Sequence, residues 1–282
     1  MKKKIIAIIV AIVLIIPVSR GWYEFLLDNF FDAELASSTQ LKFEKISDTE
    51  VEVVGYDSDL HGSITIPEKI RIGLDIYKVT SIGASAFYRC SSLTSIKIPE
   101  GVTRIGSYAF WGCSRLTSIN IPKGVTSIGK EAFSWCSRLT SINIPESVTS
   151  IGGSAFEGCS SLTSIKIPKG VTSIGNWAFK GCSSLNSIKI PESVISIGAY
   201  AFFRCSRLTS INIPESVTSI GKEAFKGCSS LTSIKIPEGV TSIGEEAFWG
   251  CYNLEIVIDN SENNVKVEES AFKGCKSVKW LK

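Results

Sequence analysis

The dipeptide Ala-Phe recurs along this chain at a nearly constant interval, and this recurrence limits the fold more than any other feature. The first seven intervals between the phenylalanines are 23 residues long, and the last is 24 residues. A cysteine follows each phenylalanine by three residues, which accounts for all nine cysteines. A fixed period of this length predicts a solenoid, in which each unit buries its apolar side chains only against its neighbours. The phenylalanines are Phe87, Phe110, Phe133, Phe156, Phe179, Phe202, Phe225, Phe248 and Phe272.

Each unit also contains the signature of a short strand. A leucine and two isoleucines stand in the spacing Leu-x-x-Ile-x-Ile, as in Leu93, Ile96 and Ile98. The alternation Ile-x-Ile predicts a strand with one buried face, and the proline that follows ends it because proline cannot donate to a continuing ladder. Ile-Gly then permits a sharp turn. Ala-Phe-x-x-Cys suits one helical turn, with phenylalanine and cysteine on the same side.

These elements define the expected fold class. It is a β-rich α/β fold, a right-handed leucine-rich-repeat solenoid of 23-residue repeats with parallel strands and short helical turns. Stacked parallel strands lie about 4.8 Å apart, so the units should form a gently curved rod with a concave strand face.

The repeat degenerates at both ends, which predicts the domain organisation. Residues 41–78 should form an N-terminal cap with a strand pair and a degenerate first repeat. Residues 79–282 should form the solenoid, with a degenerate C-terminal cap. Within that cap, residues 254–258 read Leu-Glu-Ile-Val-Ile and lack the leucine-to-isoleucine spacing of the earlier units. This departure from the repeat spacing marks the degenerate C-terminal cap.

The first twenty residues are typical of an export signal. Three lysines precede an apolar run from Ile5 to Val18, interrupted only by Pro17. A run of about fourteen residues suits a signal peptide and is short for a spanning helix, which needs roughly 20 residues. Residues 1–20 are therefore expected to be a cleaved signal peptide or an uncleaved N-terminal anchor. In both cases the segment contacts the membrane at least transiently, and the rest of the chain is secreted or held at the cell surface. Residues 21–40 form a linker that could fold as an amphipathic helix.

The cysteine column could serve disulfides, a metal, or the core. Equivalent residues on adjacent units would lie about 4.8 Å apart, within disulfide range. However, nine is an odd number, and a single histidine, His61, gives zinc few nitrogen ligands. One residue type at one apolar position is typical of a small buried side chain. We expect a ladder of buried thiols, with disulfides as the alternative.

No chemistry-bearing motif stands out elsewhere. The sequence has 30 basic and 27 acidic residues, with no basic run beyond the first four residues, which argues against nucleic-acid binding. It contains no phosphate-binding loop, paired-carboxylate site or nucleophile–base arrangement. We therefore predict no catalytic, cofactor-binding or metal-binding residues, no cofactor, and no enzymatic activity.

The motif Ile-Gly-x-x-Ala-Phe-x-x-Cys-x-x-Leu-x-x-Ile-x-Ile-Pro resembles the BspA-type leucine-rich repeat. The resemblance covers about residues 41–282, and the segment from Gly62 to Gly83 looks like the usual start of that family. It implies a surface or secreted protein of a host-associated or anaerobic microbe. Characterised relatives act as adhesins for host matrix proteins or other cells, and many have no known ligand. The phenylalanine, cysteine and leucine of the repeat are structural positions in that family.

Two surfaces are candidates for ligand binding. The first is a basic strip on the strand face, where every unit carries either lysine after the first isoleucine or asparagine there with arginine before the leucine. Its members are Lys97, Asn120, Asn143, Lys166, Lys189, Asn212, Lys235, Arg115, Arg138 and Arg207. The second is a set of aromatic residues at variable positions around Ala-Phe, a type enriched at interface hot spots. These are Tyr88, Tyr108, Trp111, Trp135, Trp177, Tyr200, Phe203 and Trp249.

Both surfaces can also be explained without ligand binding. The strip could record two repeat variants duplicated in mosaic order, and the aromatic residues could lie over the neighbouring unit and protect it. The favoured function is nevertheless an exported or cell-surface scaffold that binds a protein or glycan ligand, such as a host matrix protein or another cell surface. The alternative is a structural surface protein that self-associates without a separate ligand.

Overall fold

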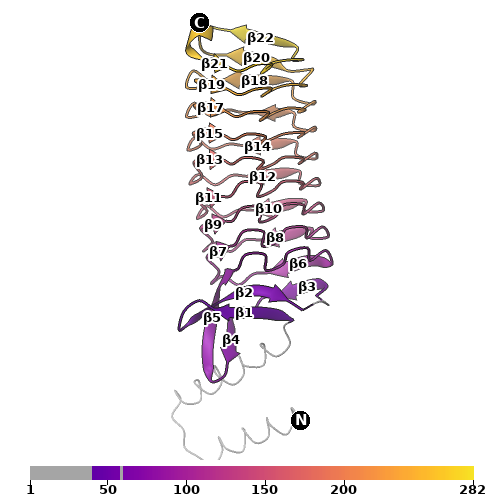
Figure 1. Cartoon of the computed structure of the whole chain (residues 1–282), viewed down its shortest axis with the longest axis vertical. Helices are drawn as coiled ribbons and strands as arrows, with labels where there is room; N and C mark the ends of the chain where they lie inside the picture. Colours follow the sequence, from indigo (N-terminus) through magenta and orange to yellow (C-terminus); the bar gives the residue numbers. More distant parts are fainter. Residues whose placement is uncertain (1–39, 58–59) are drawn as a thin grey trace, which may run out of the picture.

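A computed structural model describes residues 40–57 and 60–282 as a column of stacked coils (Figure 1). Here a coil is one repeat unit. The expected signal peptide or anchor and nearly all of the linker lie outside the described residues. Within the described ranges, no helix is long and apolar enough to cross a membrane.

The N-terminal coils are covered by two antiparallel strand pairs. The first joins β1 (Leu41–Lys45) to β2 (Glu50–Tyr56), and the second joins β4 (Lys69–Ile72) to β5 (Asp75–Ile82). Strand β2 runs parallel to β5, which begins the repeat ladder. The antiparallel pairs therefore cover one end of a parallel stack.

Two sides of the column are parallel ladders in which each strand pairs with its equivalent one coil away. The first ladder is a ten-stranded sheet. Its strands are β3 (Gly62–Thr65), β6 (Leu93–Lys97), β8 (Ser118–Asn120), β10 (Ser141–Asn143), β12 (Ser164–Lys166), β14 (Ser187–Lys189), β16 (Ser210–Ile211), β18 (Ser233–Ile236), β20 (Glu255–Ile258) and β22 (Ser277–Trp280).

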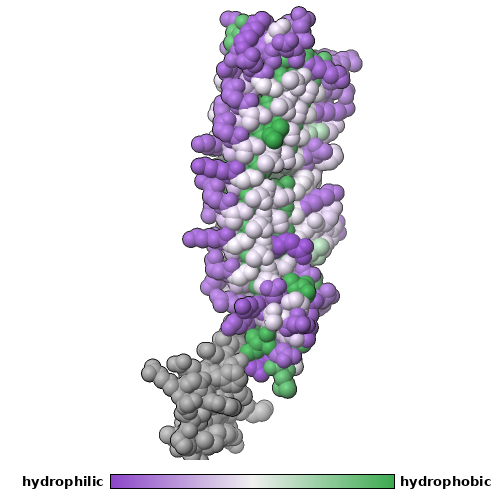
Figure 2. Space-filling model, turned by 90° about the vertical axis from the view of Figure 1, so that its left-hand side faces the viewer, coloured by the Kyte–Doolittle hydropathy of each residue, from purple (hydrophilic) through white to green (hydrophobic). Residues whose placement is uncertain are grey.

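The second ladder has shorter strands and is interrupted between β11 and β13. It comprises β7 (Arg104–Ile105), β9 (Ser127–Ile128) and β11 (Ser150–Ile151), which continue from β5, and then β13 (Ser173–Ile174), β15 (Ser196–Ile197), β17 (Ser219–Ile220), β19 (Ser242–Ile243) and β21 (Lys266–Val267). Figure 2 shows the side of the column on which these strands lie. Its central band is nearly neutral in hydropathy, and green areas are small and scattered.

The third side, which we call the ridge, consists of the segments from Gly to Cys around each Ala-Phe. The expected helical turn is wrong in detail: the described repeats contain no helix, and η3 (Glu262–Asn264) is a 3-10 turn near the C-terminus. In the first coil, the N–H of Phe87 donates to the carbonyl of Ala109 in the next coil (2.7 Å), whereas the N–H of Tyr88 donates within its own coil to Ser85 (2.9 Å). Alternate amides thus bond to the next coil, which a helix does not allow.

This bonding explains a second difference from expectation. Both views show a nearly straight column rather than a gently curved one (Figures 1 and 2). Backbone hydrogen bonds join neighbouring coils through both strand ladders and through the ridge, so the coil spacing is nearly equal on all sides. Without a wider helical side there is nothing to bend the stack, and the strand face is not concave.

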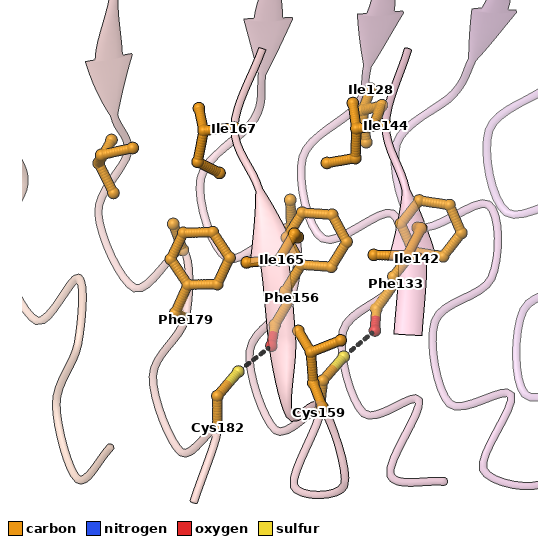
Figure 3. Packing of buried hydrophobic residues seen from close by; sticks show 14 of the residues in the cluster. Ile128, Phe133, Ile142, Ile144, Phe156, Cys159, Ile165, Ile167, Phe179 and Cys182 are labelled. Atoms are coloured by element: carbon orange, nitrogen blue, oxygen red, sulfur yellow. Dashed lines mark hydrogen bonds between the residues drawn. The ribbon is translucent and has the colours of Figure 1, made fainter. Parts of the chain in front are cut away.

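A stack of phenylalanine rings fills the core beneath the ridge. From Phe87 to Phe248, successive ring centroids lie 5.1–5.6 Å apart with interplanar angles of 10° or less. Tyr56 of the cap continues the stack at 6.1 Å. Isoleucines of both ladders pack around the rings; Figure 3 shows Ile142 and Ile165 of the first ladder and Ile128 of the second. One fully buried aromatic per coil therefore holds each coil against the next.

The cysteines form a continuous row of thiols along the core. The thiol of Cys159 donates to the carbonyl of Phe133 in the preceding coil, and Cys182 does the same to Phe156, both at 3.1 Å (Figure 3). All nine are free thiols, and all except Cys275 are buried. Burial raises the pKa of Cys159 to about 12 and that of Cys275 to about 11. The row of cysteines thus has a structural role, because each thiol supplies a hydrogen-bond donor to a core carbonyl.

The changed spacing at residues 254–258 does not break the strand ladder. Ile256 pairs with Ile234 and Ile258 with Ile236, while Leu254 remains fully buried. One residue is missing between the leucine and the first isoleucine, and the backbone closes this gap before β20 begins. The hydrogen-bonded ladder therefore outweighs a one-residue change in the repeat.

We predict that Phe179→Ala lowers the free energy of unfolding by about 3–5 kcal/mol, because it opens a cavity in a fully packed ring stack. Denaturant titration followed by circular dichroism measures this change. The control is Phe203→Ser, which removes a half-buried ridge aromatic and should cost much less. Equal losses in the two variants would contradict the placement of Phe179 in the core.

Maleimide labelling at pH 8 should modify Cys275 alone in the folded protein and all nine cysteines in guanidinium. The thiolate is the reactive species, so labelling of Cys275 should accelerate as the pH rises toward its pKa of about 11. Mass spectrometry of peptides identifies the labelled sites. Labelling of Cys159 at the rate of Cys275 would show that the row of thiols is open to solvent.

Candidate functional site

The basic strip lies on the outer face of the ten-stranded sheet, because its lysines and asparagines directly follow a buried isoleucine. All ten members are exposed. Two of its lysines are neutralised by carboxylates: Lys166 lies 2.6 Å from Glu146, and Lys235 lies 3.0 Å from Asp259. The hydrogen bond to Lys166 lowers the pKa of Glu146.

The remaining positive charge of the strip is discontinuous. Across the described part of the chain, five members form no ion pair, namely Lys97, Lys189, Arg115, Arg138 and Arg207, so the row of free charge is interrupted at Lys166 and Lys235. A hollow of about 330 Å³ lies between Lys166 and Lys189 and is floored by serine and isoleucine. The strip is therefore a row of separated charges on a flat sheet.

The ridge has three variable positions in each coil: the residue before alanine, the residue after phenylalanine, and the residue before cysteine. The residue before alanine has a positive φ in all nine coils, and so does the residue before cysteine. Glycine fills the latter position in six coils, as expected for left-handed backbone. The exceptions are Arg89, Trp135 and Arg204, with φ of 56°, 61° and 56°.

Most ridge aromatics contact a neighbouring coil. Tyr88 stacks on Trp111 at 4.9 Å, and the guanidinium of Arg89 lies 5.3 Å from the Trp111 ring. Farther along, Trp177 stacks on Tyr200 at 5.7 Å. Lysines lie over two further rings, Lys130 over Tyr108 at 5.9 Å and Lys226 over Trp249 at 4.8 Å.

Exposure separates the ridge aromatics into two kinds. Trp135 is 52% exposed, and Trp177 and Tyr88 are each 39% exposed. Tyr108, Trp111, Tyr200, Phe203 and Trp249 are half-buried. The half-buried group therefore fits the interpretation that ridge aromatics cover and protect the neighbouring coil. Trp135 is the most accessible of the predicted aromatic residues.

The ridge is hollowed beside Trp135. A trough of about 270 Å³ extends across the coils from Trp135 to Arg204. Its other lining residues are Ser137, Glu157, Gly158, Ser160, Lys180, Gly181 and Phe203. Trp135 and Phe203 were predicted from the repeat pattern, whereas the trough, Arg204 and the glycines were not. The available signal was the replacement of glycine before cysteine, which occurs in only three coils.

A larger hollow of about 760 Å³ lies between the N-terminal cap and the first coils. Its walls carry charges of both signs, including Glu50, Glu68, Lys69, Lys78 and Arg104. This hollow was not predicted from the sequence, because these residues are far apart along the chain.

Metal-ligating side chains do not gather into a site in the described part of the chain. Residues 40–57 and 60–282 contain no cluster of three or more histidine, cysteine or acidic side chains that could hold a metal ion. The thiols bond to core carbonyls, and His61 is exposed. The geometry is that of a straight column with side chains displayed on its surface.

Comparison with known proteins agrees with this geometry. The family model described as the BspA type leucine rich repeat region, in six copies, matches residues 63–169 and 152–279. A leucine-rich repeat protein from Bacteroides ovatus is 31% identical, with a TM-score of 0.67 over 86% of this chain and 75% of that one. A leucine rich cell surface protein from Faecalibacterium prausnitzii is 27% identical, with a TM-score of 0.53 over 86% and 93%.

A third solved structure, the leucine-rich repeat protein of T. pallidum, is 26% identical, with a TM-score of 0.54 over 76% of this chain and 88% of that one. No curated protein matches the sequence. The family match extends over most of the described column, and its repeat is the unit that builds both ladders and the ridge. The chain therefore belongs to the BspA-type leucine-rich-repeat family.

Proposed function

We propose that this protein is a non-catalytic cell-surface scaffold that binds a protein or glycan ligand on its ridge. The observation that supports this most strongly is the backbone of Trp135. A left-handed conformation costs a non-glycine residue roughly 1–2 kcal/mol, and six equivalent coils avoid the cost by using glycine. More than half of the Trp135 side chain is exposed, so burial compensates the cost only in part.

Ligand binding explains why such a residue is kept. Trp177 supports the same interpretation, since serine occupies its position in three other coils, at Ser85, Ser154 and Ser270. Exposed tryptophan supplies large contact area with little loss of side-chain freedom, which favours it at binding hot spots.

A location at the cell surface fits two observations. The related Faecalibacterium prausnitzii protein is described as a cell surface protein. The first twenty residues of this chain have the charge and apolar pattern of an export signal or anchor. We therefore propose that the column stands outside the cytoplasm, where matrix proteins and glycans are the available partners.

The test is binding of the purified full-length chain to immobilised host matrix proteins and mucin, measured by biolayer interferometry. We expect saturable binding that the double variant Trp135→Gly/Trp177→Ser loses. Both substitutions introduce the residue that other coils carry at the same position, so the melting temperature should be unchanged or higher.

The matched control is Tyr252→Ser. It removes a side chain that is 65% exposed but lies outside the three variable ridge positions, and binding should persist. Equal loss of binding in the control and the double variant would indicate non-specific adhesion. Absence of binding to every target would contradict the proposal.

One observation favours a second function, self-association. Among the described strands, β22 pairs only with β20, which leaves its outer edge open. Phe272, Cys275 and Trp280 beside it are only partly buried. Open strand edges pair readily with other chains. End-to-end association would make the light-scattering mass rise with protein concentration, and Val278→Pro should suppress that rise. A mass that stays constant would contradict it.

A further inference from the structure

We propose that the trough on the ridge is a subsite for one carboxylated pyranose of an acidic glycan, with Trp135 packing on the sugar ring and Arg204 binding its carboxylate. This inference rests on the proposed ligand-binding function and names a ligand class and a position for it.

The walls of the trough follow from the direction in which the large side chains lean. Trp135 lies over Gly158 of the next coil, and a Cβ added to Gly158 would come within 2.9 Å of the indole. Arg204 leans the same way, over Gly227. Gly181 belongs to the coil between those of Gly158 and Arg204. A Cβ added to Gly181 would lie 3.8 Å from the backbone of Gly158 and would meet no side chain within 4 Å. The floor at Gly181 is therefore bare backbone.

The size of the trough suits a single ring. It holds about 270 Å³, slightly less than the roughly 300–1,000 Å³ of drug-sized ligand pockets. Coils repeat about every 4.8 Å, so the coil that Trp135 covers and the coil of Phe203 are on the order of 10 Å apart. A six-membered ring fits between aromatic side chains at that separation. A folded protein surface does not enter so narrow a space.

The charges select an acidic ligand. Glu157 is held by Lys180 at 2.9 Å and is mostly buried, so the trough displays little free negative charge. The guanidinium of Arg204 lies 5.1 Å from the Phe203 ring, at the rim of the trough. Within residues 40–57 and 60–282, Arg204 makes no ion pair. A positioned guanidinium without a partner carboxylate suits bidentate binding of a ligand carboxylate.

Polar groups along the side distinguish a sugar from an aromatic peptide side chain. The hydroxyls of Ser137 and Ser160 each donate to the serine carbonyl one coil back, which leaves their oxygens able to accept. The ammonium of Lys180 lies beside them and can donate. A ring with hydroxyl groups on its edge uses these partners, whereas a phenylalanine or tryptophan side chain does not. The apolar face of the same ring packs on the indole.

Titration calorimetry of the full-length chain tests the assignment with three probes. Sialyllactose presents a terminal carboxylated ring, a hyaluronan tetrasaccharide presents internal ones, and an N-acetylglucosamine tetrasaccharide is neutral. We expect binding of one or both acidic probes, with the neutral probe at least roughly tenfold weaker. The acidic probe that binds more tightly identifies whether the ring is terminal or internal.

Two variants locate the site. Trp135→Gly and Arg204→Gly each restore the glycine that six coils carry, and each should weaken the acidic probe roughly tenfold or more. The control Arg89→Gly makes the same change at the same repeat position outside the trough and should leave the affinity unchanged. Equal weakening by Arg89→Gly would mean that the glycan binds by general charge and would overturn the assignment.

The remaining outcomes separate this inference from the proposed function. If no probe binds the wild-type chain while it still binds matrix protein or mucin, the trough assignment fails and the scaffold function stands. If the neutral probe binds as tightly as the acidic ones, the role of Arg204 is wrong. If a tryptophan-containing acidic peptide competes for the trough and the glycans do not, its ligand is a peptide and the inference is overturned. If neither probes nor surface targets bind, both proposals fail.

Discussion

Neighbouring coils of this protein must meet at one spacing on every side, because backbone hydrogen bonds join them through both strand ladders and through the ridge. The other structural features depend on this constraint. It keeps the phenylalanine rings within stacking distance, brings each thiol to a carbonyl of the preceding coil, and leaves the column straight. Core positions cannot vary without breaking a contact on both sides, so variation is confined to side chains that point outward.

The sequence predicted the features that follow from periodicity and missed those that depend on backbone conformation. Phe179 and Cys182 lie three residues apart, a spacing that a helical turn and a hydrogen-bonded turn share. The left-handed residues that distinguish the two are serine, glutamate, tyrosine and tryptophan at the position before alanine, such as Ser154, and these residue types do not signal a positive φ. Curvature was mispredicted for the same reason, since it was inferred from a helical side that the ridge does not have.

The candidate surfaces were predicted as columns of residue types, and the structure shows why columns are not sufficient. Lys166 and Lys189 occupy equivalent positions, but Glu146 neutralises only the first. Trp111 and Trp135 both lie on the ridge, yet one is held beneath Tyr88 and Arg89 and the other is open. The trough depends on two consecutive glycines beyond Trp135 and on the lean of its side chain, which no single column of the repeat reveals.

The hydrogen bond from each thiol to the preceding coil has a mechanical consequence. Every coil is joined only to its two neighbours, through the same set of bonds, so a force pulling along the column has no long-range contact to oppose it. Under tension the coils should detach one after another from a free end, each releasing a similar length of chain. A column of this kind would act as an extensible tether that lengthens in equal steps.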